Sequence, residues 1–331
     1  MFNNLFLYTF LLFFFNYASS QKGNYKEYHY LINKSKDSQV DSVFYFNETA
    51  FQSAEPFPDD LLRLGFGYYK KGDLKNAKKV FLKAIKCGYQ AEPDGDYYNS
   101  SFMIEYDLNY ISNHKFDFGQ YLNKMYRENK KKVIKLRKKH LEKTNNNPDN
   151  KIFESLLHNE KYFQDLRFLF FNNKIEDTIA LKNIFRYGST PNSYYALDLL
   201  KKNNFPRRLN CTRWNSQSIT ILLNHIVFGF LNKQDAEEFV SLLWKLVERG
   251  DLTPYEYAKT YDHYINVFVD ENKNMFGTVF TLDEQNNNKL IIEDLINPIE
   301  VNIIRRKYWL IDIETSCKNT GASLPKNYVE K

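Results

Sequence analysis

Apolar residues recur at intervals of three and four positions along much of the chain. The clearest case is residues 235–248, whose spacing predicts an amphipathic helix. Gly250 ends that helix, and the segment after it begins a second one. Thr253 is suited to cap it, with proline at the next position and Glu256 completing a capping box. We therefore expect two antiparallel helices joined by a short turn, the second running to about Val269.

The pattern changes after these helices. Residues 276–282 and 289–295 are β-prone and flank a polar run, which predicts a small hairpin. A further helix is expected over residues 299–311, and residues 316–331 read as a loose tail. The chain is thus predicted to be mainly α, with helical hairpins in its N-terminal part and one small β-hairpin in a helical C-terminal domain.

A second helical pair is predicted near the N-terminus by a specific pattern. It consists of Leu61-x2-Leu64-Gly65-x2-Tyr68 followed by Ala77-x3-Phe81-x2-Ala84. Residues 58–91 resemble one tetratricopeptide repeat, although Tyr89 stands where that family has its closing proline. The resemblance implies that neighbouring helices complete the packing and that a concave face near Tyr68 and Tyr69 binds a partner. A single helical hairpin that happens to fit the pattern is the alternative.

Lysine and arginine crowd residues 125–143. This stretch is either a solvated helix whose apolar side, including Val133, Ile134 and Leu141, faces a core, or a surface for anionic membrane or nucleic acid. The polar run 145–150 follows and marks a domain boundary. The expected organisation is a repeat-like helical region over 21–124, a basic helix and linker over 125–150, and a C-terminal domain over 151–315.

The first twenty residues lack charge and contain an apolar run that ends near Ala18 and Ser20. This pattern predicts a signal peptide over residues 1–20 and hence export to the periplasm, the cell surface or the medium. No later apolar run is long enough to span a membrane. In an oxidising compartment three cysteines allow at most one internal disulfide, for which Cys211 and Cys317 are the expected pair.

Composition excludes several classes of protein. The chain has 331 residues, of which 43% are hydrophobic, with 46 Lys+Arg against 40 Asp+Glu. Such a chain is too apolar for intrinsic disorder, and a net charge of +6 does not indicate a dedicated nucleic-acid binder. The sequence has no phosphate-binding loop, nucleophile elbow or zincin motif, no Cys or His spacing typical of a metal site, and nothing that identifies a cofactor.

The C-terminal half resembles a known family over residues 153–310. Phe205-Pro206, Asn224-His225, Asp262-His263, the run Asn274 to Val279, and Arg305 before Trp309-Leu310 occupy the places of that family's motifs. The family is the bacterial domain-of-unknown-function family numbered 6624, which is often secreted and brings no known activity. His263, Asn274 and Val279 depart from its pattern. If the family has an active site, this chain has therefore lost some of the polar side chains that could contact a ligand there.

His225, Asp262 and Arg305 are the candidate catalytic or ligand-binding residues. Either they form a site for an anion or a carbonyl group, or His225 is a core histidine and Asp262 forms a buried bridge with Arg305. The function expected first is an exported bacterial module that binds an unidentified protein or peptide through its repeat-like helices. The alternative is an enzyme or small-ligand-binding protein centred on these three residues.

Overall fold

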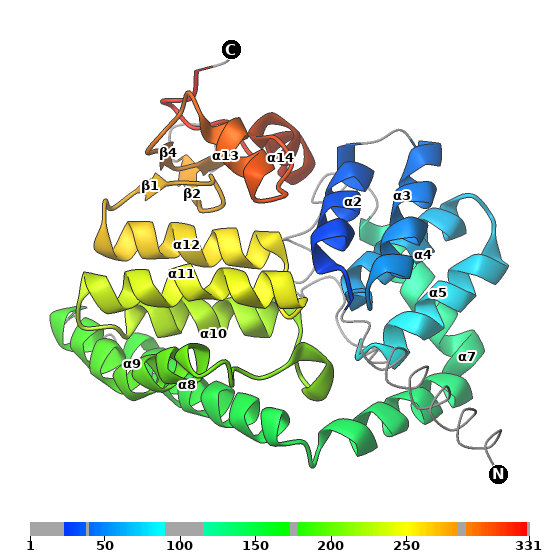
Figure 1. Ribbon diagram of the computed structural model, residues 1–331, viewed down its shortest axis with the longest axis horizontal. Coiled ribbons are helices and arrows are strands. Elements are labelled where there is room, and N and C mark those ends of the chain that lie inside the picture. The colour runs from blue at the N-terminus through cyan, green and yellow to red at the C-terminus, as the bar shows by residue number, and fades with distance from the viewer. Residues whose placement is uncertain (1–22, 38–39, 90–114, 173–177, 284–288, 330–331) are drawn as a thin grey trace, which may run out of the picture.

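The computed structural model describes residues 23–37, 40–89, 115–172, 178–283 and 289–329, and the protein is mainly α-helical over these ranges (Figure 1). The predicted signal peptide lies outside the described residues. In the described part of the chain, no helix combines the length and apolar character that crossing a membrane requires.

Two helical pairs form the N-terminal part. The first consists of α2 (Tyr25–Asp37) and α3 (Val40–Ser53), and the second of α4 (Pro58–Lys70) and α5 (Leu74–Lys86). The turn of the second pair consists of a glycine that ends α4 and an aspartate that caps α5. Gly72 adopts a positive φ of 77° after α4, and the Asp73 carboxylate accepts the Asn76 N–H at 3.1 Å to cap α5.

Helix α7 (Lys115–Thr144) supplies the packing that this helical pair needs. Its Tyr121 lies against Gly65, where an added Cβ would stand 2.3 Å from the tyrosine hydroxyl. Gly65, the small residue of the repeat-like pattern, therefore allows α7 to pack closely against α4. Further along α7, Val133 is buried as expected, whereas Ile134 is 51% exposed, so the prediction that Ile134 faces the core is wrong.

The C-terminal part is built on five helices that enclose the largest apolar cluster. A short turn after α7 leads into α8, close to the predicted domain boundary. Helix α11 ends at Gly250, whose φ is 79°, and α12 begins with the predicted capping box between Thr253 and Glu256. The helices are α8 (Pro148–Asn172), α9 (Thr178–Lys201), α10 (Ser216–Phe228), α11 (Lys233–Arg249) and α12 (Pro254–Phe268).

The strands are shorter than the sequence pattern suggests. The predicted hairpin forms between β2 (Phe280–Asp283) and β3 (Lys289–Ile292), with Phe280 opposite Ile292. β1 (Lys273–Asn274) pairs in parallel with β4 (Asp294–Leu295). Residues 276–279 form a loop instead of a strand, because Asp262 binds their backbone N–H groups.

The C-terminal end differs from its predicted form. Helix α13 covers only Val301–Lys307. The tail expected to be loose from residue 316 instead completes helix α14 (Ile313–Thr320). It continues to Asn327, whose side chain accepts the Leu295 N–H at 2.9 Å and donates to the Leu295 carbonyl at 2.7 Å. These hydrogen bonds fix the segment on the strands.

The N-terminal helices pack directly on the C-terminal part, and Arg208 is the main polar link. It lies in a short 3₁₀-helix, η2 (Arg208–Asn210). Its guanidinium donates to the carbonyls of Gly250 at 3.0 Å, Glu55 at 3.3 Å and Pro56 at 3.4 Å. The same group stacks over the Phe57 ring at 4.0 Å. One buried cation thus joins the α3–α4 connection to the end of α11.

Candidate functional site

His225 lies on α10 and is held by a buried carboxylate. Its Nδ1 is 3.1 Å from Oε2 of Glu160 on α8. Glu160 is 2% exposed and also accepts hydrogen bonds from Ser189 at 3.1 Å and Asn192 at 2.9 Å. Because donors from α9 and α10 converge on this carboxylate of α8, its role is to join the three helices, and His225 is one of its donors.

Asp262 is fully buried on α12 and binds the loop that precedes β2. Its Oδ1 accepts the N–H groups of Met275 at 2.7 Å and Phe276 at 2.8 Å. Its Oδ2 accepts the Thr278 N–H at 2.8 Å and hydroxyl at 2.7 Å. Burial raises the pKa of Asp262 to about 6, and these four hydrogen bonds limit the rise.

Arg305 lies on α13 and holds the same loop from its other side. Its Nη1 donates to the Phe276 carbonyl, and its Nε donates to the Ile311 carbonyl at 2.6 Å. Its side chain is 1% exposed, and burial lowers its pKa.

The three sequence candidates therefore do not form one catalytic group. Asp262 and Arg305 both bind the backbone at Phe276, but among the described residues they form no direct ion pair. The adjacent His263 is near enough to His225 for that residue to contribute to the lowered pKa of His263, after the larger effect of burial. Successive residues on a helix differ by about 100° in direction, so only one of this pair can face α10.

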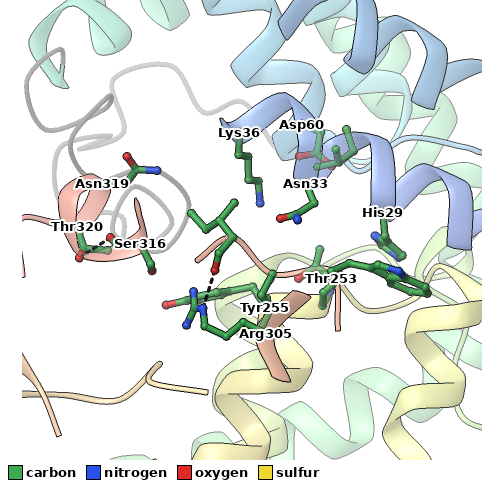
Figure 2. A pocket seen from close by; sticks show the side chains of 15 residues that line it. His29, Asn33, Lys36, Asp60, Thr253, Tyr255, Arg305, Ser316, Asn319 and Thr320 are labelled. Atoms are coloured by element: carbon green, nitrogen blue, oxygen red, sulfur yellow. Dashed lines mark hydrogen bonds between the residues drawn. The ribbon is translucent and has the colours of Figure 1, made fainter. Parts of the chain in front are cut away.

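A cavity lies where α2 meets α12, α13 and α14 (Figure 2). Its volume is about 60 Å³. Arg305 is the only one of the three sequence candidates that lines it. Its other polar lining residues come from both halves of the chain and include His29, Asn33, Lys36, Asp60, Thr253, Tyr255, Ser316, Asn319 and Thr320.

The two tyrosines predicted to bind a partner occupy different surroundings. Tyr68 lines a groove of about 340 Å³ between α3, α4 and α5, and its hydroxyl donates to Glu48. Tyr69 instead packs on α7, with its ring 5.3 Å from that of Tyr121. Only Tyr68 is therefore placed to touch a molecule in the groove.

The predicted Cys211–Cys317 disulfide is absent. Cys211 lies in the main C-terminal cluster and Cys317 in the cluster around the strands and α14. Each is a buried thiol, and so is Cys87. Within the described ranges, no three His, Cys, Asp or Glu side chains converge as metal ligands would.

Sequence reasoning missed Glu160 and Arg208. One signal could have identified Glu160. It follows Phe153 and Leu156 at helical spacing on α8, which places a carboxylate on a buried apolar face. No sequence signal could have identified the role of Arg208, since its partners Glu55 and Pro56 lie about 150 positions earlier in the chain.

We expect the protein to be less stable in mild acid because two of its histidines are buried. Burial lowers the pKa of His29 to about 3 and that of His263 to about 4. Both take up a proton near pH 6.5 only when unfolded, so stability falls as the pH drops below that value. Asp262 opposes them, because its raised pKa favours the folded state as the pH falls from about 6 towards 4. We expect a net loss of about 2 kcal/mol between pH 7 and pH 5, measured by urea unfolding.

The variant His29→Gln should remove most of this dependence, since glutamine can still donate to the Val247 carbonyl that His29 contacts at 3.2 Å. The matched control is His158→Gln at an exposed position on α8, which should leave the pH profile unchanged. Equal unfolding free energies of the wild type at the two pH values would contradict the prediction.

Comparisons of the chain with family models, with curated proteins and with solved structures gave no match.

Proposed function

We propose that the protein is an exported interaction module that binds an acidic peptide segment of a partner protein. The binding site is the groove around Tyr68. The observation that carries the proposal is the make-up of this groove, which combines an apolar base with lysines along one wall.

The apolar part of the groove suits peptide side chains. Phe51 of α3, Leu64 and Tyr68 of α4 and Val80 of α5 line it. The rings are held in place, because Tyr68 donates to Glu48 and the Phe44 ring lies 4.7 Å from that of Tyr68. A groove with a fixed aromatic wall can accept an apolar side chain at little cost in conformational entropy.

The charge of α5 indicates that the peptide is negatively charged. This helix carries five lysines and no acidic residue. Lys79 and Lys83 line the groove, with the Lys83 ammonium 5.6 Å from the centre of the Phe51 ring. A peptide with acidic residues beside its apolar anchors would complement this wall and associate faster at low salt.

The signal-peptide pattern supports a partner outside the cytoplasm, and the resemblance to a tetratricopeptide repeat supports peptide binding by these helices. The family resemblance of residues 153–310 adds no activity to this proposal. The alternative of a site built jointly by His225, Asp262 and Arg305 receives no support from their positions, because His225 binds Glu160, whereas Asp262 and Arg305 both hold the backbone at Phe276.

Fluorescence anisotropy with a short labelled peptide, in which glutamate alternates with leucine and phenylalanine, tests the proposal. We expect saturable binding that weakens with salt and is lost when lysine replaces glutamate in the peptide. The double variant Lys79→Glu/Lys83→Glu should weaken binding roughly tenfold or more.

The matched control is Lys78→Glu/Lys86→Glu, which changes the net charge equally on the same helix but outside the groove. It should retain most of the affinity. If both double variants lose affinity to the same extent, the peptide senses only the overall charge of α5, and the groove is not its site.

A further inference from the structure

The cavity between α2 and the α12–α14 segment is separate from the peptide groove and has its own chemistry (Figure 2). A water-sized probe occupies about 10–15 Å³ of such volume, so about 60 Å³ gives space for roughly four to six non-hydrogen atoms. Ile32, Pro254 and Leu310 provide apolar lining beside the polar groups. A ligand here would be small and partly apolar.

Arg305 gives the cavity its charge. A buried guanidinium is costly unless acceptors and a negative charge compensate it. In the part of the chain that the structure describes, its acceptors are the Phe276 and Ile311 carbonyls, which engage Nη1 and Nε. No described carboxylate lies within ion-pair distance of it. The N–H groups of Nη2 therefore remain to meet an acceptor from outside the chain.

The opposite wall adds a second cation. Figure 2 shows the Lys36 side chain extending from α2 into the cavity, towards Arg305 and Tyr255. The one carboxylate in the lining, Asp60, is already engaged, since it accepts the Tyr28 hydroxyl at 2.6 Å and pairs with Arg63 at 3.5 Å. The cavity thus presents two cationic side chains and a carboxylate whose charge is partly compensated.

We propose that this cavity binds a small organic carboxylate. The carboxylate group accepts hydrogen bonds from Nη2 of Arg305 and from Lys36, and the carbon skeleton packs on Ile32, Pro254 and Leu310. The apolar lining favours an organic acid over inorganic phosphate, which has no apolar surface to place there.

Binding would also fix the two halves of the chain to each other. Lys36 and Ile32 belong to the N-terminal helices, whereas Arg305, Pro254 and Leu310 belong to the C-terminal part. A ligand that contacts both halves binds the packed arrangement and not the separated one, so it stabilises the packing in proportion to its occupancy.

Isothermal titration calorimetry of the full chain with propionate, in a buffer without carboxylates, tests the proposal directly. We expect saturable binding, accompanied by slower amide exchange in both α2 and α14. Propionamide, which has the same shape without the charge, should not bind. Phosphate should bind at least about tenfold more weakly than propionate, because it lacks an apolar part.

Because Arg305 also holds Phe276 and Ile311, the informative variant is on the other wall. Lys36→Met should weaken propionate binding about tenfold, the effect of losing one charge-assisted hydrogen bond. Lys34→Met is the matched control, since Lys34 lies on the same helix with its ammonium 4.6 Å from the centre of the Tyr30 ring and outside the cavity.

The proposal is overturned if propionate does not bind, if propionamide or phosphate binds as tightly, or if Lys36→Met and Lys34→Met have the same affinity. Failure of the peptide to bind the Tyr68 groove would leave these results unaffected, because the two sites share no lining residue.

Discussion

Replacing Gly250 with alanine is expected to destabilise the protein by about 4 kcal/mol. Two effects combine at this position. Its φ of 79° strains any residue with a Cβ, and an added Cβ would stand 2.1 Å from the Tyr25 ring. Because Tyr25 begins α2 while Gly250 ends α11, the collision would push the N-terminal helices away from the C-terminal part. Urea unfolding followed by circular dichroism measures the loss.

Gly72 provides a matched control for the strain. It also ends a helix, at a φ of 77°, but nothing lies within 4 Å of an added Cβ. Gly72→Ala should therefore cost only about 1–2 kcal/mol. The double variant Tyr25→Ala/Gly250→Ala should be more stable than the sum of the single variants implies, since the collision is gone. Equal losses for Gly250→Ala and Gly72→Ala would show that the Tyr25 ring moves aside freely.

Asp262→Ala is the second substitution with a large expected effect, again about 4 kcal/mol. The change leaves three backbone N–H groups and the Thr278 hydroxyl without their acceptor in a buried loop. It also removes a negative charge that favours the buried Arg305 guanidinium. Urea unfolding gives the global loss, and faster amide exchange at Met275, Phe276 and Thr278 locates it.

Asp270→Ala is the matched control for Asp262→Ala. Asp270 lies just after α12 and forms an exposed ion pair with Lys273 at 2.6 Å, with both side chains more than 40% exposed. Its loss should cost less than about 1 kcal/mol. If Asp262→Ala were as mild as Asp270→Ala, the loop would be held by its other contacts, and Asp262 would not be its anchor.

Features that depend on neighbours in the sequence could be predicted. The Thr253–Glu256 capping box, the positive φ of Gly250 and the Asp73 cap involve residues three or four positions apart. Side-chain type and spacing determine such motifs without help from the rest of the fold. The mainly helical class and the paired helices at residues 58–86 follow from the same kind of signal.

Features that depend on residues far apart in the sequence could not be predicted. Gly277 lies in a loop with a φ of 70°, but no local pattern shows that Asp262, 13 to 16 positions earlier, holds this loop. In the same way, the apolar residues around His225 do not point to its partner Glu160, 65 positions away. Contacts between helices depend on how the helices pack, and the periodicity of one helix does not identify its partner residues on another.

The three buried cysteines allow local opening to be measured by alkylation kinetics in three regions of the protein. Burial raises the pKa of Cys87 to about 12 and that of Cys317 to about 11, and it also raises the pKa of Cys211. Only a thiolate reacts at a useful rate, so labelling requires local opening. Cys87 lies in the α4–α5–α7 cluster, Cys211 in the main C-terminal cluster and Cys317 beside the strands. Their three labelling rates therefore rank the opening free energies of three regions within the native chain.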